Sequence, residues 1–100
     1  MSDGAKRGEA VRREVMSDAF VDRALGNATD FTQPLQAFIN EHAWGGVWTR
    51  DGLDRRTRSL ITLSALTALK CPNELKGHVR GALNNGCTVV EIRETLLHCA

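Results

Sequence analysis

The chain contains no tyrosine, and only three phenylalanines, two tryptophans and two prolines among its 100 residues. This shortage, together with charged residues that recur at helical intervals, favours an all-α protein. No apolar run approaches the roughly 20 residues that a membrane-spanning helix requires, so no membrane span is predicted. The first ten residues are polar and lack the apolar stretch of a secretory signal, which predicts a cytoplasmic protein.

Neither sign of charge is in excess, because thirteen lysines and arginines face twelve acidic residues. Nucleic-acid and membrane-surface binding require a basic patch, so the sequence predicts neither kind of partner. The three cysteines form no CxxC pair, and in a reducing cytoplasm we expect them to stay free thiols. No cysteine and histidine cluster has the short paired spacing of a zinc site, so no metal is predicted.

The length predicts a single domain over residues 9–100, preceded by a disordered tail over residues 1–8. Apolar periodicity and capping signals predict helices at about 9–25, from a box at 30–33 to a stop at 44–46, at about 54–69, from 72 to the Asn-Asn-Gly run at 84–86, and from 88 to the end. The segments 30–33 and 88–91 both resemble capping boxes. The inward apolar positions are expected to be Val11, Val15, Ala19, Val21 and Leu25 in the first helix, and Ile92, Leu96 and Leu97 in the last.

Glu74 and His78 are the clearest candidate pair for acid–base chemistry in the sequence. They lie four residues apart on one predicted helix, so their side chains share a face. A carboxylate at that spacing can hold an imidazole for general acid or base work. The alternative is an exposed acid–base pair that only stabilises the helix.

Other polar and aromatic residues allow two interpretations each. His98 follows an apolar pair and either faces a cleft or is a partly buried core histidine. Trp44 and Trp48, with Arg50, lie on a predicted Gly-rich loop over residues 44–52, where tryptophans either line a site or close the end of a helical bundle.

Three arginines, Arg55, Arg56 and Arg58, stand in the first turns of the predicted helix 54–69. The helix dipole disfavours positive charge at that end, so we expect compensation by an anionic ligand or by a carboxylate of another helix. Arg58 and Ser59 are expected to be the positions most accessible to a ligand.

Cys71 precedes Pro72 at a predicted helix start, where a thiol can be reactive. A dithiol mechanism would need a second cysteine at the right spacing, and position 74 is a glutamate. Cys87 and Cys99 are expected to be small packing residues.

The chain resembles the carboxymuconolactone decarboxylase family, which also contains alkyl hydroperoxidase D-like proteins. Three stretches carry the resemblance: VRREVMSDAFVDRAL, WGGVWTRDGLDRRTRSLITLSAL and ELKGHVRGALNNGCTVVEIRETLLH. Together they span from about Val11 to Ala100. The resemblance implies an all-α bundle of the alkyl-hydroperoxidase-D-like type that lacks its last helix, since family members continue beyond the LLHxA motif.

The redox branch of that family carries CxxC, followed by three residues and a histidine. In the same frame this chain has Cys71 and Glu74 before His78, and Ser59 stands where that branch has an acidic residue. Both departures favour the decarboxylase branch. A thiol-dependent peroxidase or disulfide reductase is the first alternative, and an inactive, truncated oligomerisation fragment is the second.

The resemblance implies loss of CO2 from 4-carboxymuconolactone in the protocatechuate branch of the β-ketoadipate pathway. The unsaturated lactone is its own electron sink, so no cofactor is expected. His78 is then the expected proton donor and Glu74 its orienting partner or a second acid. Arg50 and Arg58 are expected to bind the substrate carboxylates, beside Trp48 as an apolar wall and His98 as a polar wall. The resemblance also implies a homo-oligomer, a trimer or a hexamer.

Overall fold

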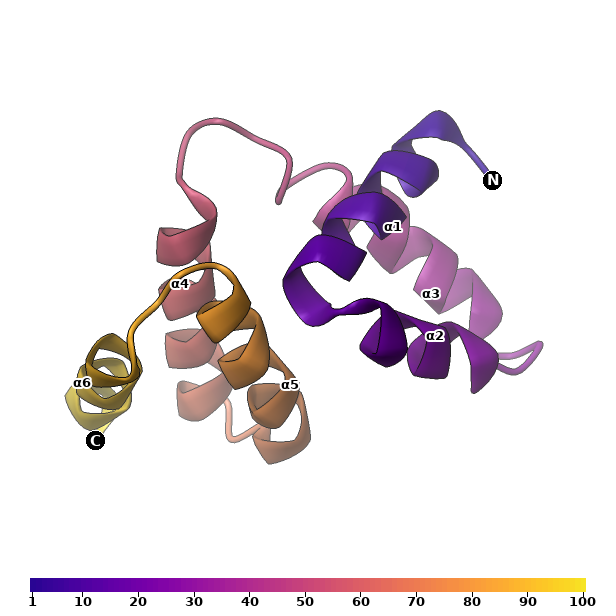
Figure 1. The fold of residues 1–100 in the computed structure, drawn as a ribbon. Helices are drawn as coiled ribbons and strands as arrows, with labels where there is room; N and C mark the ends of the chain where they lie inside the picture. Colours follow the sequence, from indigo (N-terminus) through magenta and orange to yellow (C-terminus); the bar gives the residue numbers. More distant parts are fainter. The chain divides into compact units, whose positions relative to one another are not determined.

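The structure is a computed structural model that describes residues 1–100. It contains helices and no strand, which confirms the all-α prediction. In chain order the elements are α1 (Asp3–Met16), α2 (Asp18–Gly26), α3 (Gln33–Phe38), the π-helix η1 (Ile39–Trp44), α4 (Arg55–Ala68), α5 (Pro72–Asn84) and α6 (Val89–Cys99) (Figure 1). None of these helices is both long and apolar enough to cross a membrane. The chain divides into two compact units, residues 1–52 and 53–100.

In the first unit, α1 begins six residues before its expected start. Ser2 is its N-cap and accepts a hydrogen bond from the backbone N–H of Ala5 at 3.0 Å. The side chain of Ala5 is buried. The expectation of a disordered stretch at 1–8 is therefore wrong for the residues from Asp3 onward, because a serine cap and a buried alanine order this turn. The single domain over residues 9–100 stays a prediction.

The continuous helix expected over 9–25 is broken at Ser17. This residue has a φ of 88° and a ψ of 154°, and its hydroxyl accepts a hydrogen bond from the N–H of Phe20 at 3.2 Å to cap α2. The break changes the helical phase, so Val11, Val15 and Val21 are buried whereas Ala19 is exposed. The prediction for Ala19 was wrong because it assumed one uninterrupted period.

The segment 30–33 forms no capping box. Thr32 is the residue before α3 and makes no cap hydrogen bond to the helix. Its hydroxyl instead accepts from the N–H of Thr29 at 2.8 Å, while the hydroxyl of Thr29 accepts from the N–H of Thr32 at 3.2 Å. The helix then continues as the wider π-helix η1, which ends at Trp44, so Trp44 is helical rather than part of a loop.

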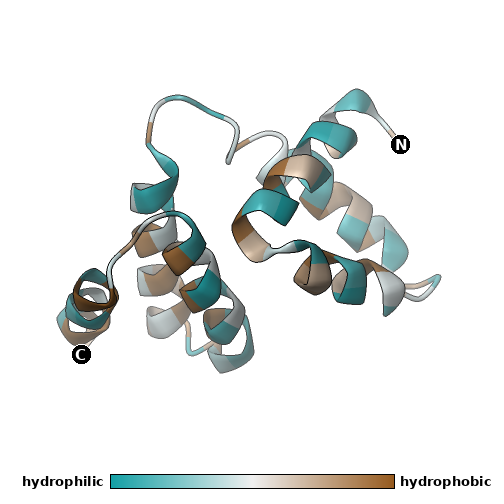
Figure 2. Cartoon of the chain, in the orientation of Figure 1, coloured by the Kyte–Doolittle hydropathy of each residue, from teal (hydrophilic) through white to brown (hydrophobic).

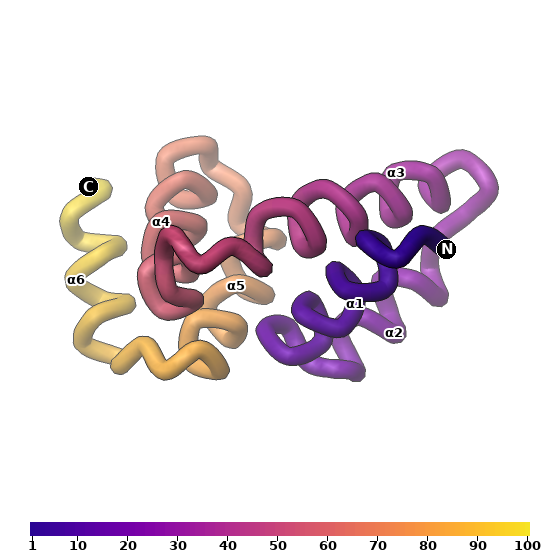
Figure 3. Tube along the Cα trace, turned by 90° about the horizontal axis from the view of Figure 1, so that it is seen from above, coloured from indigo at the N-terminus to yellow at the C-terminus, as the bar shows by residue number.

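Glycines allow α1 to approach η1 closely. A side-chain carbon on Gly8 would overlap the carbonyl of Asn40 and lie 2.7 Å from the backbone nitrogen of Gly45. At this crossing the core of the first unit consists of Val11, Val15, Met16, Val21 and Trp44, all buried. Figure 3 shows α1 and α2 from above, in indigo and violet.

The boundaries of the second unit agree with the sequence prediction. Asp54 caps α4 by accepting from the N–H of Thr57 at 2.7 Å. Pro72 begins α5, and Gly86, at a φ of 89°, follows its end. Thr88 and Glu91 form the expected capping box of α6, with reciprocal hydrogen bonds of 2.8 and 3.0 Å.

The second unit has its own core, in which α4 packs against both α5 and α6. The buried residues are Leu63, Ala82, Cys87 and Ile92. Figure 2 shows the interleaved hydrophobic and hydrophilic residues of these amphipathic helices. Leu97, expected to face inward, is 61% exposed, because the side chain one position after Leu96 turns away from α4.

Candidate functional site

Helix α5 carries the acid–base pair that the sequence singled out. Cys71 occupies the N-cap position, Pro72 opens the helix, and Glu74 lies in the first turn. Glu74 is exposed, and His78, one turn later, is half-buried. This geometry puts a carboxylate and an imidazole on one helix face, with the imidazole the more shielded from water.

Carboxylates compensate positive charge at the start of α4. Arg56 forms an ion pair with Glu91 of α6, which is the carboxylate from another helix that the basic cluster led us to expect. The N–H of Thr57 holds the pKa of Asp54 below its usual value, and the charge of Arg56 acts in the same direction. Asp54 and Glu91 therefore offset positive charge where the helix dipole disfavours it.

Ser59 is a buried structural residue, contrary to the expectation that it would be accessible to a ligand. It is 1% exposed, and its hydroxyl accepts a hydrogen bond of 2.9 Å from the amide nitrogen of Asn85. The same amide lies 3.4 Å from the carbonyl of Arg55. Asn85 thus ties the end of α5 to the first turns of α4. Arg58, one position before Ser59, is half-buried.

The three cysteines are free thiols. Cys87 is buried, as expected, and its thiol donates to the carbonyl of Arg56 at 3.4 Å. Burial raises the pKa of Cys87, against the opposing charge of Arg56, so this thiol stays protonated. Cys71 and Cys99 are half-buried; the sulfur of Cys71 lies 3.7 Å from the carbonyl of Leu69.

His98 lines an open groove of about 370 Å³ between α4 and α6. The other lining residues are Thr57, Leu60, Ile61, Ser64, Glu94 and Thr95. His98 is exposed at this groove, so it is not a buried core histidine. Glu94, one helical turn before His98, is a polar neighbour that the sequence analysis did not select, although its i, i+4 spacing repeats that of Glu74 and His78.

Trp48 and Arg50 belong to the first unit. The ring of Trp48 stacks on that of Trp44, with centroids 4.9 Å apart and planes inclined by 26°. Trp44 is 5% exposed and belongs to the buried core of the first unit. Arg50 is exposed, directly after the turn that follows η1.

The six predicted site residues are divided between the two units. Trp48 and Arg50 lie in residues 1–52, whereas Arg58, Glu74, His78 and His98 lie in residues 53–100. Within the second unit, Glu74 and His78 share a face of α5. The groove lined by His98 contains none of the other five. No three histidine, cysteine, aspartate or glutamate side chains are grouped so that they could hold a metal ion.

Comparison with known proteins places this helical architecture in a family. The model of the carboxymuconolactone decarboxylase family matches residues 33–100, from the start of α3 to the last residue. The chain therefore belongs to this family, as its motifs indicated.

Two curated relatives match nearly the whole chain. The nitrosuccinic acid decarboxylase of Metarhizium robertsii is 53% identical over 93 residues, which are 93% of this chain and 65% of the relative. The 4-carboxymuconolactone decarboxylase of Acinetobacter baylyi is 48% identical over 95 residues, which are 95% of this chain and 71% of the relative. This chain thus spans about two thirds of the length of these relatives, and both relatives are decarboxylases.

Proposed function

We propose that the protein is a cofactor-independent decarboxylase whose substrate is 4-carboxymuconolactone. The observation that carries the proposal is the face of α5 with Glu74 and the half-buried His78, in a chain of the carboxymuconolactone decarboxylase family. The similarity to the decarboxylase of Acinetobacter baylyi supports this choice of substrate.

The reaction needs an acid and an anion-binding group. When the bond between the ring carbon and its carboxylate breaks, CO2 leaves and the electron pair moves through the C=C bond into the lactone carbonyl. A proton then returns to a ring carbon to give β-ketoadipate enol-lactone. In this proposal His78 delivers the proton and Glu74 orients the imidazole, because one helical turn brings the two side chains together.

Arginine is the residue suited to hold the two substrate carboxylates, since its planar guanidinium can bind a carboxylate through two hydrogen bonds. Arg58 and Arg50 are the proposed carboxylate-binding residues. Trp48 and His98 are proposed as an apolar and a polar substrate contact.

A second substrate has specific support, because the relative that acts on nitrosuccinic acid is 53% identical to this chain. A nitro group can accept the electron pair of a departing carboxylate, as the lactone carbonyl does. The same acid and the same arginines would serve that reaction. The kcat/KM of the purified protein for the two substrates, measured side by side, decides between them.

The catalytic assignment is tested by following consumption of the lactone through its ultraviolet absorbance. Assays with and without EDTA show whether turnover needs a metal ion. His78→Ala is expected to lower kcat by about 10²- to 10⁴-fold, the usual contribution of a positioned acid. His42→Ala is the matched control, because His42 is an exposed histidine of the first unit and has no proposed role. Full activity of a folded His78→Ala variant would refute the assignment.

The arginine assignment has its own test. Arg58→Lys and Arg50→Lys are each expected to raise KM about tenfold, because lysine cannot make the paired hydrogen bonds of arginine. Arg80→Lys, at an exposed position of α5, should leave KM unchanged. The thiol-dependent alternative predicts instead that Cys71→Ser abolishes activity and that the protein reduces peroxides.

A further inference from the structure

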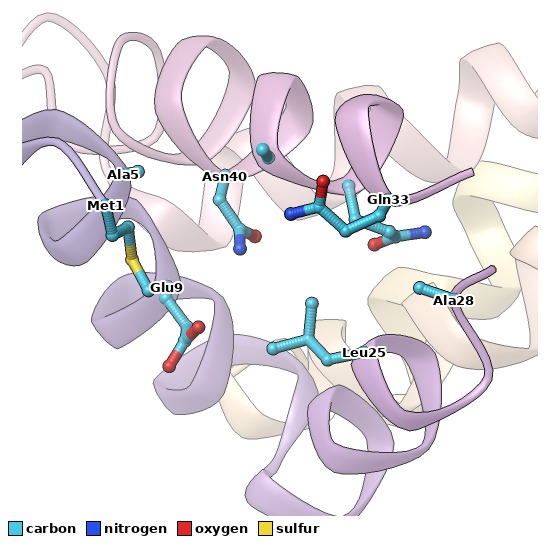
Figure 4. Close-up of a pocket in the computed structure, with 9 residues that line it drawn as sticks. Met1, Ala5, Glu9, Leu25, Ala28, Gln33 and Asn40 are labelled. Carbon is cyan, nitrogen blue, oxygen red and sulfur yellow. The ribbon is translucent and has the colours of Figure 1, made fainter. Parts of the chain in front are cut away.

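A cavity in the first unit has a polar wall that the decarboxylase reaction does not use. It measures about 250 Å³ and lies among α1, α2, α3 and η1. This is the volume of about eight water molecules at ~30 Å³ each, so the cavity suits a small molecule. Figure 4 shows the labelled side chains around the opening: Met1, Ala5, Glu9, Leu25, Ala28, Gln33 and Asn40. Gln36 and Ala37 complete the lining.

Three carboxamides form the polar wall, and a buried arginine sets the orientation of two of them. Arg12 is 7% exposed, and its Nη1 donates to the Oε1 of Gln36 at 2.9 Å and to the Oδ1 of Asn40 at 3.0 Å. A guanidinium can only donate, so the amide oxygens must face Arg12 and the NH2 groups must face away from it. Gln36 and Asn40 thus bind Arg12 through their oxygens and line the cavity together with Gln33.

The charge of Arg12 is compensated incompletely. It forms no ion pair, and its Nε is buried without a hydrogen-bond partner. Burial lowers the pKa of Arg12, and the nearby charge of Glu9 opposes that effect. A cation bound to two amide oxygens polarises the amides and strengthens their NH2 groups as donors. This wall therefore favours an anionic acceptor such as a carboxylate.

Glu9 supplies an opposite charge on the α1 side of the cavity. Its Oε2 accepts from the Nε of Arg13 at 3.3 Å, but the same arginine also binds Asp18 and Asp22, at 3.1 and 2.9 Å. One guanidinium shared among three carboxylates leaves negative charge at Glu9. The remaining walls, Leu25, Ala28 and Ala37 among them, are aliphatic.

We propose that this cavity binds a free α-amino acid with an aliphatic side chain. Its carboxylate accepts from the NH2 groups of Gln36 and Asn40, its ammonium group pairs with Glu9, and its side chain packs against Leu25 and Ala28. This site is independent of the proposed decarboxylation, because none of its residues has a role in that reaction.

The test is a titration of the whole isotope-labelled chain, followed by NMR through the side-chain NH2 signals of Gln36 and Asn40. Three probes of similar shape separate the contributions: leucine, 4-methylpentanoate, which lacks the ammonium group, and 3-methylbutylamine, which lacks the carboxylate. Leucine is expected to shift both NH2 signals saturably in the millimolar range. Each of the other two probes should bind about tenfold more weakly, the usual effect of losing one charged hydrogen bond.

Asn40→Asp is the decisive variant, since it keeps the oxygen that binds Arg12 and replaces the NH2 donor by a carboxylate. Leucine affinity should fall by about tenfold or more. Asn27→Asp, with the same charge change at an exposed position, should bind leucine like the unchanged chain. Gln36→Glu repeats the test at the second donor, should Asn40→Asp not fold.

Glu9→Gln should remove the preference for leucine over 4-methylpentanoate while leaving the affinity for 4-methylpentanoate unchanged. The proposal is overturned if leucine gives no saturable shift, if 3-methylbutylamine binds as tightly as leucine, or if the variants with an intact fold bind leucine unchanged.

Discussion

The amide of Asn85 connects two helices through a single buried hydroxyl. Its nitrogen donates to Ser59 at 2.9 Å, in a place where Ser59 is almost fully removed from water. A buried polar atom without a partner costs more than the hydrogen bond itself contributes, because its desolvation is not repaid. We therefore expect the hydrogen bond between Asn85 and Ser59 to stabilise the fold.

Asn85→Ala is expected to lower the free energy of unfolding by about 1–3 kcal/mol, since the hydroxyl of Ser59 loses its donor. Asn27→Ala is a matched control, because Asn27 also ends a helix, with φ −86° and ψ −4° against −85° and 7° for Asn85, yet is exposed. Urea denaturation of both variants measures the difference. Equal losses would show that the cost comes from the helix end and not from Ser59.

At the residue scale, the sequence allowed predictions where they depended only on local helical spacing or on residue type. The prediction that Glu74 and His78 share a helix face needed only that residues 72–84 form a helix. Cys87 was correctly expected to be a packing residue. The sequence could not show that Ser59 is buried, because its partner lies 26 residues away. Whether the predicted residues act together on a substrate stays a prediction.

At the scale of the helices, the close crossing of α1 and η1 depends on a glycine, which has no side chain. Gly8 lies inside α1, where glycine by itself weakens a helix by about 1 kcal/mol relative to alanine. The backbone of Asn40 and Gly45 occupies the space that a β-carbon would need. Close approach of the two backbones therefore outweighs helix propensity at this position.

Gly8→Ala should destabilise the protein by about 3 kcal/mol, because neighbouring backbone cannot move aside as a flexible side chain can. Gly26→Ala, at the end of α2 with no atom within 4 Å of the added carbon, should change stability by less than about 0.5 kcal/mol. Thermal unfolding followed by circular dichroism compares the two. A stabilised Gly8→Ala variant would show that propensity governs this helix after all.

The helices of the second unit were predictable because their end signals are local. Asp54, Pro72, Gly86 and the Thr88 capping box each act within a few residues of the helix end. The break at Ser17 and the π-helix η1 were missed, because the apolar period was taken to run through Ser17 and because no signal at 39–44 was assigned to a wider helix. No local pattern distinguishes a capping serine inside an apolar period from an ordinary helical serine.

At the scale of the whole molecule, many large apolar side chains remain on the surface of the single chain. Strongly exposed examples are Phe31, Phe38, Leu69, Val89 and Leu97, between 60% and 92% exposed. Exposed apolar side chains mark contacts with other chains where they form a continuous patch. The homo-oligomer predicted from the family resemblance would give such residues a contact.

Sedimentation velocity checks that prediction directly. We expect a mass of three or six times the 11.0 kDa of the chain. A single species at the mass of one chain, across a range of concentrations, would refute both the trimer and the hexamer.

The ion pairs of Arg13 have a consequence for behaviour in concentrated salt. Arg13 binds Glu9 on its own helix, and Asp18 and Asp22 of α2, so one cation spans the backbone break at Ser17. Asp18 and Asp22 are largely exposed, and at 1 M ionic strength charges are screened beyond about 3 Å. Raising the ionic strength therefore weakens this bridge while leaving the apolar core of the first unit intact, so concentrated salt is expected to loosen the angle between α1 and α2.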